Sequence, residues 1–320
     1  MQSKRAMWGH FPLAGESLRG RGGELVTQRG RIVIAGAGGQ AGSCLAAEAI
    51  RRGRDVLALT SSQWDITDPQ AAGQVVQTGD VVINCAAYTN VDGAEGDEER
   101  AYAVNAAGPE RIARACARAG ARLIHISTDY VFSGDFGGSA PHPYEPDDLT
   151  APHGVYGRTK LAGEQAVLAA SPEAVVVRTA WVYTGGSGKD FVAVMRKLAA
   201  GDRIVEVVDD QIGSPTYVAD LVAALLEVAD GQVQARLVHA ANAGEVSRFG
   251  QARAVFEGVG ADPARVVPVT SAHNPRPAPR PAYSVLSGRQ SEQAGLTPLR
   301  PWQDALAEAL ARALGAPSRP

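Results

Sequence analysis

The sequence predicts an α/β fold in which a doubly wound parallel sheet is followed by a smaller, irregular lobe. Three observations support this prediction. From Arg31 onward, short and nearly continuous apolar runs alternate with helical patterns, as in βαβ units. A glycine-rich turn joins the first apolar run to the first helix. After about Val182 the alternation gives way to shorter pieces rich in glycine and proline.

Five apolar runs are expected to form buried strands, because parallel strands covered on both faces show no polar alternation. They are RIVIA at 31–35, DVLALT at 55–60, DVVINCA at 80–86, ARLIHIS at 121–127 and EAVVVRTAWVY at 173–183. Helices are expected after the glycine-rich turn and over 109–120, 156–170 and 302–314. The helix at 109–120 has proline near its start and glycine at its end, which are ordinary helix boundaries.

These patterns divide the chain into two parts. Residues 31–181, joined again by a helix and strand at about 217–240, are expected to form a Rossmann-type cofactor domain. Residues 182–216 and 241–320 are expected to form the substrate-binding lobe. Residues 1–30 contain several arginines and glycines but no apolar core of a secretory signal, which predicts a disordered extension.

Composition excludes several classes of function. The formal net charge of −3 gives no electrostatic reason to expect a nucleic-acid partner. No run approaches the ~18 apolar residues that a membrane span requires. The three cysteines, Cys44, Cys85 and Cys116, are too far apart for a disulfide framework or a metal cluster. We therefore expect a cytoplasmic protein with reduced thiols, no membrane association and no metal.

The segment GAGGQAG at 36–42 directly follows the first predicted strand and opens a helix. It fits two spacings, Gly36-x-Gly38-x-x-Ala41 and Gly36-x-x-Gly39-x-x-Gly42. Glycines permit a tight turn and close backbone approach, and a helix N-terminus offers unpaired N–H groups to a pyrophosphate. This position in a βαβ unit predicts dinucleotide binding.

The end of the second strand favours NADPH over NADH, with NADH kept as the alternative. The dinucleotide fingerprint expects an acid there to bind the ribose 2′-hydroxyl, but this strand ends in Thr60, Ser61 and Ser62. Asp65 lies further on and is expected to meet the adenine. Three arginines on the preceding helix and turn are interpreted either as partners of the 2′-phosphate or as solvated surface: Arg51, Arg52 and Arg54.

The segment YGRTK places Tyr156 and Lys160 four residues apart, on one face of a helix. A lysine cation beside the phenol is expected to lower its pKa, so that Tyr156 can exchange a proton with a carbonyl oxygen. Thr128, in STDYVF, lies at the carboxyl end of the fourth strand, where open α/β sheets bind ligands. Its hydroxyl is expected to hydrogen-bond the substrate carbonyl.

These motifs resemble those of the extended short-chain dehydrogenase/reductase family. The similarity runs in order from Arg31 to about Leu310 and is narrowest to the family's reductases of 4-keto nucleotide sugars. Its strongest motifs are NCAAYTNVDGAE at 84–95, STDYVFSG at 127–134, VYGRTKLAGE at 155–164, RTAWVY at 178–183 and DDQIGSPT at 209–216. The resemblance implies reduction of the C4 ketone of dTDP-4-dehydro-β-L-rhamnose by NAD(P)H, the last step toward dTDP-L-rhamnose.

The resemblance also assigns residues to roles. It implies a substrate site in which Thr128 and Asp129 touch the sugar, Trp181 packs on it and Arg280 meets the diphosphate. Together with the motifs above, it implies a cofactor site that includes the catalytic pair and these residues: Gly36, Gly39, Gln40, Ala41, Gly42, Thr60, Asp65, Ile66, Ala86, Ala87 and Tyr88.

Two other functions share the same motifs. One is a nucleotide-sugar epimerase or a reductase of another 4-keto sugar, and the other is a non-catalytic regulatory subunit of the same fold. The expected partner is a small nucleotide sugar, and the chain is expected to be a monomer or a homodimer. Some relatives carry a glutamate for a magnesium-dependent dimer contact where this chain has Cys44.

Overall fold

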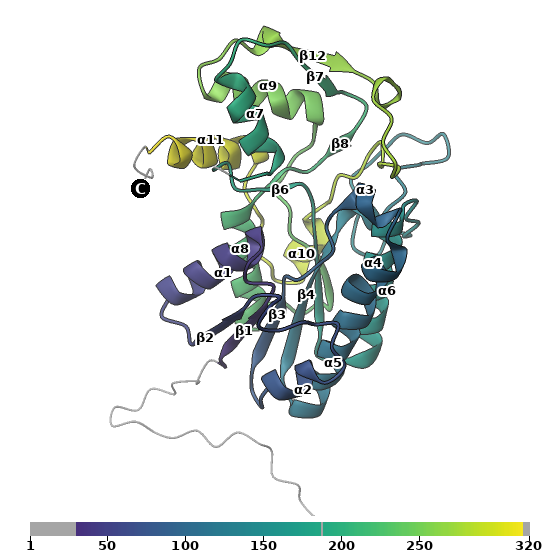
Figure 1. Cartoon of the computed structure of the whole chain (residues 1–320), viewed down its shortest axis with the longest axis vertical. Coiled ribbons are helices and arrows are strands. Elements are labelled where there is room, and N and C mark those ends of the chain that lie inside the picture. The colour runs from purple at the N-terminus through teal and green to yellow at the C-terminus, as the bar shows by residue number, and fades with distance from the viewer. Residues whose placement is uncertain (1–29, 187, 316–320) are drawn as a thin grey trace, which may run out of the picture.

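The computed structural model describes residues 30–186 and 188–315. Apart from Gly30, the predicted N-terminal extension lies outside them. The described chain forms a six-stranded parallel sheet in the order β10-β5-β4-β3-β1-β2, with a smaller lobe at one end of it (Figure 1). Its strands are β1 (Ile32–Ala35), β2 (Val56–Leu59), β3 (Val81–Asn84), β4 (Arg122–Thr128), β5 (Val175–Thr179) and β10 (Leu237–His239).

Helices cover both faces of the sheet (Figure 1). On one face, Ile32 and Ile34 share a core with residues of α1 (Gln40–Arg51) and α8 (Val218–Ala229). On the other face, Val33 and Ala35 share a core with residues of three helices. These helices are α2 (Ala71–Val75), α5 (Gly108–Ala119) and α6 (Val155–Ala170). Burial on both sides explains the continuous apolar runs and confirms the predicted doubly wound fold.

Strand order places the ligand-binding edge. From β1 the chain passes to β2 on one side, and then crosses back to β3 on the other side of β1. This reversal is a topological switch point, and open α/β sheets bind ligands beyond the carboxyl ends of the strands there. The predicted return of the chain to the sheet is confirmed, since β10 pairs in parallel with β5.

The run at 173–183 is not one strand, and that prediction is wrong. β5 ends at Thr179, and Trp181 adopts a left-handed backbone with φ 48°. β6 (Val182–Tyr183) then pairs with β9 (Thr216–Tyr217) in a separate two-stranded sheet. A left-handed conformation is costly for a bulky residue and is therefore not expected at a tryptophan. The apolar pattern by itself gives no sign of the break.

The smaller lobe contains α7 (Phe191–Ala199), α9 (Arg248–Gly258) and two further strand pairs. β7 (Val205–Val208) pairs in parallel with β12 (Val266–Val269), and β8 (Ile212–Gly213) pairs antiparallel with β11 (Val246–Ser247). The remaining helical segments are α3 (Val91–Ala94), α4 (Glu98–Tyr102), a π-helix at Ala103–Ala107, 3₁₀ turns at Asp129–Val131, Pro263–Arg265 and Ser271–His273, α10 (Arg289–Gln293) and α11 (Trp302–Ala313). No helix among the described residues is long and apolar enough to cross a bilayer.

A buried ion pair joins α6 to β5. Arg178 donates to both carboxylate oxygens of Glu164, at 2.9 and 2.7 Å, and both side chains are 3% exposed. The guanidinium also donates to the Pro146 carbonyl at 3.0 Å and lies over the Phe132 ring. This network ties together the helix that carries the YGRTK motif and the strand that precedes Trp181.

Arg178→Ala is expected to lower the free energy of unfolding by about 3–5 kcal/mol, because it leaves the Glu164 carboxylate buried without its partner. The matched control is Arg114→Ala, which removes an exposed pair with Glu110 on α5. That change is expected to cost less than about 1 kcal/mol. Urea unfolding of both variants measures the difference. Equal destabilisation by the two substitutions would contradict the structural role of the buried pair.

Candidate active site

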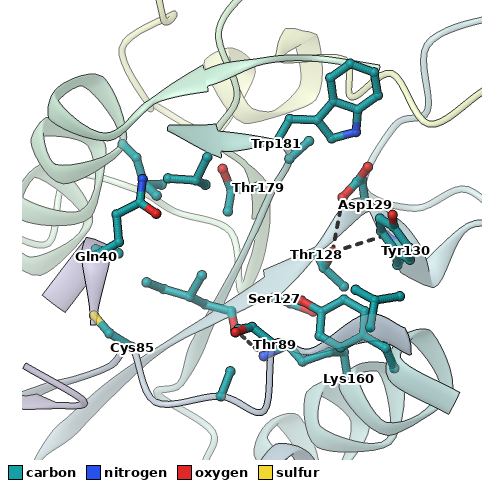
Figure 2. A pocket seen from close by; sticks show the side chains of 18 of the residues that line it. Gln40, Cys85, Thr89, Ser127, Thr128, Asp129, Tyr130, Lys160, Thr179 and Trp181 are labelled. Carbon is teal, nitrogen blue, oxygen red and sulfur yellow. Dashed lines mark hydrogen bonds between the residues drawn. The ribbon is translucent and has the colours of Figure 1, made fainter. Parts of the chain in front are cut away.

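Two adjoining cavities lie at the carboxyl ends of the central strands. The first, of about 450 Å³, is lined by residues of α1, β4, α6 and the loop after β5, including Gln40, Thr128, Lys160 and Trp181 (Figure 2). The second, of about 770 Å³, lies over β1 and β2. Both are lined by Gly39, Cys85 and Ala87, so they meet at the glycine-rich turn.

The cavities bring together almost all of the predicted site residues. The first is lined by Gly39, Gln40, Ala41, Ala87, Thr128, Asp129, Tyr156, Lys160 and Trp181. The second is lined by Gly36, Gly39, Thr60, Asp65, Ile66, Ala86, Ala87 and Tyr88. Gly42 and Arg280 are the predicted residues that line neither.

The glycine-rich turn has the geometry of a phosphate cradle. Gly36 has φ +78°, and a Cβ there would lie 2.6 Å from the backbone nitrogen of Ala86. A Cβ at Gly42 would lie 2.3 Å from the Gly36 carbonyl oxygen, so Gly42 lets the helix pack on the turn instead of lining the cavity. α1 then starts after Gly39 with no side-chain cap and no acidic residue in its first turn. Its first N–H groups are therefore directed at the cavity as an anion site.

The three arginines proposed as partners of a 2′-phosphate do not line the second cavity. Arg51 and Arg52 both pair with Glu48 at 2.7 Å, and Arg54 pairs with Asp230 at 2.7 Å. The structure favours the alternative interpretation of surface residues for Arg51 and Arg52, which are 72% and 41% exposed. Glu48 precedes them by three and four residues on the same helix, a spacing at which side chains pair, whereas Asp230 is distant from Arg54 in sequence.

Arg100, on α4, is the cation that the sequence analysis missed in the second cavity. It lines this cavity together with Thr60 and Asp65. Hydrogen bonds from Thr67 lower the pKa of Asp65, and the charge of Arg100 lowers it further. Nothing in its sequence neighbourhood marks Arg100, since the strand end and α4 are 40 residues apart and meet only in the fold.

Asn105 connects Tyr88, which lines the second cavity, to α6. Its side chain accepts from the Tyr88 backbone N–H at 2.8 Å and donates to the Tyr88 carbonyl at 3.1 Å. It also donates to the Thr159 hydroxyl on α6 at 3.0 Å. Asn105 is fully buried in the π-helix. It therefore holds Tyr88 in register with the turn of α6 that carries the YGRTK residues.

Tyr156 and Lys160 line the first cavity from α6, as predicted. Their electrostatics differ from the expectation that Lys160 acidifies the phenol. Burial raises the pKa of Tyr156 above its ordinary value, and only the hydrogen bond with Thr128 lowers it. Burial lowers the pKa of Lys160 to about 8, and its ammonium donates to the Ile126 carbonyl of β4 at 2.6 Å. Helical spacing placed both groups on one face, but it could not reveal the carbonyl that engages the flexible amine.

Thr128 and Asp129 form a connected pair at the end of β4 (Figure 2). The Thr128 hydroxyl donates to Asp129 Oδ1 at 3.1 Å and accepts from the Tyr130 N–H at 3.2 Å. Ser284 donates to the other oxygen of Asp129 at 2.6 Å. Burial raises the pKa of Asp129 to about 6, so at neutral pH it is largely a carboxylate that orients the Thr128 hydroxyl.

Arg280 is not placed in the first cavity. Its guanidinium donates to Asp92 Oδ1 and to the Ala278 carbonyl, both at 2.7 Å. Its assignment to a diphosphate remains a prediction. The arginine that does line the first cavity is Arg248, the first residue of α9, which the sequence analysis did not single out.

Comparisons with known proteins identify the family of the chain. The family model described as the RmlD substrate binding domain matches residues 30–314 of this sequence. A dTDP-4-dehydrorhamnose reductase of Mycobacterium tuberculosis is 73% identical over 281 residues, covering 88% of this chain and 92% of that protein. A protein of the same name from Mycolicibacterium smegmatis is 63% identical over 286 residues, covering 89% of this chain and 86% of that one.

Solved structures give the same result. A dTDP-4-dehydrorhamnose reductase from Bacillus anthracis, in complex with NADP, matches with a TM-score of 0.82 and 34% identity. The match covers 89% of this chain and 100% of that one. The predicted resemblance to reductases of 4-keto nucleotide sugars is confirmed, and the chain belongs to the RmlD substrate-binding domain family.

Proposed function

We propose that this protein reduces the C4 ketone of dTDP-4-dehydro-β-L-rhamnose to dTDP-L-rhamnose with NADPH, the last step of dTDP-L-rhamnose synthesis. The observation that carries the proposal is the lining of a single cavity. Thr128, Tyr156 and Lys160 share it with the phosphate-cradling turn at Gly39 and Gln40. The proposal agrees with the names of the relatives described above.

The residues of both cavities fit a dinucleotide. The turn at Gly36 leaves no room for a Cβ, and the uncapped start of α1 after Gly39 would hold the pyrophosphate. Thr60, Asp65 and Ile66 would hold the adenosine half in the second cavity. Arg100, which lines the same cavity, would lie near the 2′-phosphate of NADPH. Ala86, Ala87 and Tyr88 line the second cavity, and Ala87 lines the first as well, so they would line the nicotinamide half. When bound, NADPH supplies the hydride that adds to the ketone carbon.

Tyr156 is proposed to donate the proton that the ketone oxygen gains. Its raised pKa keeps the phenol protonated at neutral pH, which is the form that a reduction consumes. Thr128 is proposed to hydrogen-bond the same oxygen. Its single proton is directed to Asp129 in this structure, so the hydroxyl must rotate toward the substrate. Lys160, buried at 2% exposure, keeps a positive charge beside the reacting atoms below a pH of about 8.

The two parts of the fold are proposed to divide the work. In this proposal residues 31–181 and 217–240 hold the cofactor, and residues 182–216 with 241–320 bind the nucleotide sugar. The three cysteines are free thiols, which supports a cytoplasmic location. We propose that the enzyme acts as a monomer or homodimer.

Turnover of a panel of 4-keto nucleotide sugars tests the function. Purified protein is incubated with NADPH and each sugar, and oxidation of NADPH is followed by its absorbance. The highest kcat/KM is expected with dTDP-4-dehydrorhamnose. A higher value with another 4-keto sugar would reassign the substrate, and interconversion of epimers without net NADPH oxidation would assign an epimerase.

Cofactor choice gives a separate prediction. Thr60 and Ser61 line the second cavity without an acidic side chain beside them at the strand end, so NADPH is expected to give a higher kcat/KM than NADH. Thr60→Asp is expected to shift this ratio toward NADH by repelling the 2′-phosphate. Steady-state kinetics with both cofactors measure the shift. A wild-type preference for NADH would show that the acid-free strand end was misinterpreted.

A further inference from the structure

Arg248 lies in the substrate cavity in a defined stack. Its guanidinium carbon lies 3.4 Å from the centroid of the Trp181 ring and 5.0 Å from that of Phe191. It lines the same cavity as Thr128 and Tyr156, and Figure 2 shows Trp181 at the margin of this cavity beside Asp129. Ser247 caps the helix that Arg248 begins by accepting from the Gly250 N–H, so the backbone under the arginine is fixed.

Trp181 is held from the other side by Gly213. A Cβ at Gly213 would lie 2.5, 2.6 and 2.9 Å from Cε2, Cζ2 and Nε1 of the indole. Because these bonded atoms are nearly equidistant from that point, Gly213 approaches a face of the ring and not its edge. If Arg248 stacked on the same face of the indole, its guanidinium would be one of the three atoms nearest to a Cβ at Gly213. All three of these atoms belong to Trp181, so Arg248 stacks on the opposite face. The indole is therefore sandwiched between the two residues.

The sandwich changes the role expected of Trp181. With both faces covered, the indole presents an edge to the cavity, whereas the sequence-based expectation was a surface on which the substrate packs. The left-handed backbone at Trp181 is what turns the ring into this position. The indole thus serves as a platform that orients the planar guanidinium.

The guanidinium of Arg248 has no carboxylate in direct contact with it within the described part of the protein. The side chain forms no ion pair there, and the one hydrogen bond of the guanidinium is a 3.4 Å contact to Gln251 Oε1. Burial lowers the pKa of Arg248 to about 10, so the group remains a cation at neutral pH. The neighbouring Tyr130 phenol and the charge of Asp129 oppose this decrease in pKa, and the charge of Arg280 adds to it. A partly buried cation that no carboxylate contacts directly favours binding of an anion.

We propose that Arg248, stacked on Trp181, binds the diphosphate of the nucleotide sugar and so positions the ketone at Thr128 and Tyr156. This rests on the proposed function. Among the described residues that line the first cavity, the cations are Lys160 and Arg248. Lys160 lies deep, on the Ile126 carbonyl, and the start of α1 serves the cofactor's own pyrophosphate. Arg248 is the cation left for the substrate, and its fork matches phosphate oxygens.

Binding of thymidine diphosphate (dTDP) and of thymidine, measured by calorimetry, tests the proposal without requiring turnover. Arg248→Ala is expected to raise the Kd of dTDP about 10- to 100-fold, the effect of losing charge-assisted hydrogen bonds. The Kd values of thymidine and NADPH are expected to stay within about 2-fold of wild type, because neither ligand uses this guanidinium. In kinetics, KM for the sugar nucleotide is expected to rise more than kcat falls.

The matched control is Arg253→Ala. Arg253 is on the same helix and stacks on Phe249 at 5.7 Å, but it is exposed and outside the cavity. It is expected to leave the Kd of dTDP unchanged. Arg248→Lys is expected to bind dTDP with an affinity between those of Arg248→Ala and wild type, because an ammonium keeps the charge but not the fork. Should Arg248→Ala not fold, a wild-type affinity of Arg248→Lys would overturn the proposal.

Other outcomes separate this proposal from the proposed function. If Arg248→Ala and Arg253→Ala bind dTDP equally, or if thymidine loses as much affinity as dTDP, Arg248 does not bind the diphosphate. If dTDP binding depends on Arg248 but no 4-keto sugar is reduced, the proposed function fails and the diphosphate site stands. If the sugar is reduced and Arg248→Ala is kinetically normal, the diphosphate site alone is wrong.

Discussion

Tyr156→Phe is expected to lower kcat by ~10²–10⁴-fold, the range over which a general acid contributes to a rate. The substitution removes the phenolic proton and keeps the ring, which packs edge-on against Tyr130 at 5.5 Å. Packing and cofactor affinity should therefore remain close to wild type. Burial keeps the wild-type phenol protonated and ready to donate. Phenylalanine has no acidic proton, so the side chain of the variant cannot donate one.

The measurement is steady-state kcat at saturating sugar nucleotide and NADPH, together with the Kd of NADPH by fluorescence titration. Tyr102→Phe serves as the control, because Tyr102 is on α4 and lines neither cavity. Near-wild-type kcat in Tyr156→Phe would show that another group supplies the proton. An equally large loss in Tyr102→Phe would show that the effect is not specific to the site.

Lys160→Met is expected to have opposite effects on activity and stability. Activity should fall on the order of 10²-fold, because a fixed cation is lost beside the developing negative charge. Stability should rise at pH 7, because burial lowers the pKa of Lys160 from 10.5 to about 8. A lowering of the pKa of this size corresponds to about 3 kcal/mol of lost folding stability in the wild type. Methionine removes that cost, but it also removes the hydrogen bond to the Ile126 carbonyl, which lowers the stability of the variant by about 1 kcal/mol. The net gain is then about 2 kcal/mol.

The pH dependence of unfolding isolates this effect. Between pH 8 and 10.5 the unfolded state binds more protons at Lys160 than the folded state does. The free energy of unfolding of the wild type is therefore expected to rise with pH across this window. Lys160→Met should lack this rise. A variant that is less stable than wild type at pH 7, with an unchanged pH profile, would show that Lys160 stabilises the fold instead of straining it.

Most of the fold followed from patterns that are local in sequence. Buried parallel strands keep both faces apolar, so β1 to β4 are visible as continuous runs, and the glycine turn marks where α1 begins. The run at 173–183 failed because its break depends on a left-handed backbone at Trp181. That conformation is maintained by packing against Gly213 and Arg248, which are distant in sequence.

The site divides in the same way. Tyr156, Lys160 and Thr128 were predicted because their spacing and strand end place them at one edge of the sheet. Arg100 and Arg248 were missed because each reaches a cavity only through the tertiary fold. Conversely, the pairing of Arg51 and Arg52 with Glu48 follows a helical spacing that the sequence shows, whereas the pairing of Arg54 with Asp230 depends on the fold.

The destination of the hydride tests the central claim most directly. NADPH carrying deuterium at the transferred position of the nicotinamide is incubated with the protein and dTDP-4-dehydrorhamnose, and the product is examined by NMR. The proposed mechanism predicts dTDP-L-rhamnose with deuterium at C4 of the sugar and one NADPH oxidised per product. Deuterium at another carbon, or product formed without oxidation of NADPH, would contradict it.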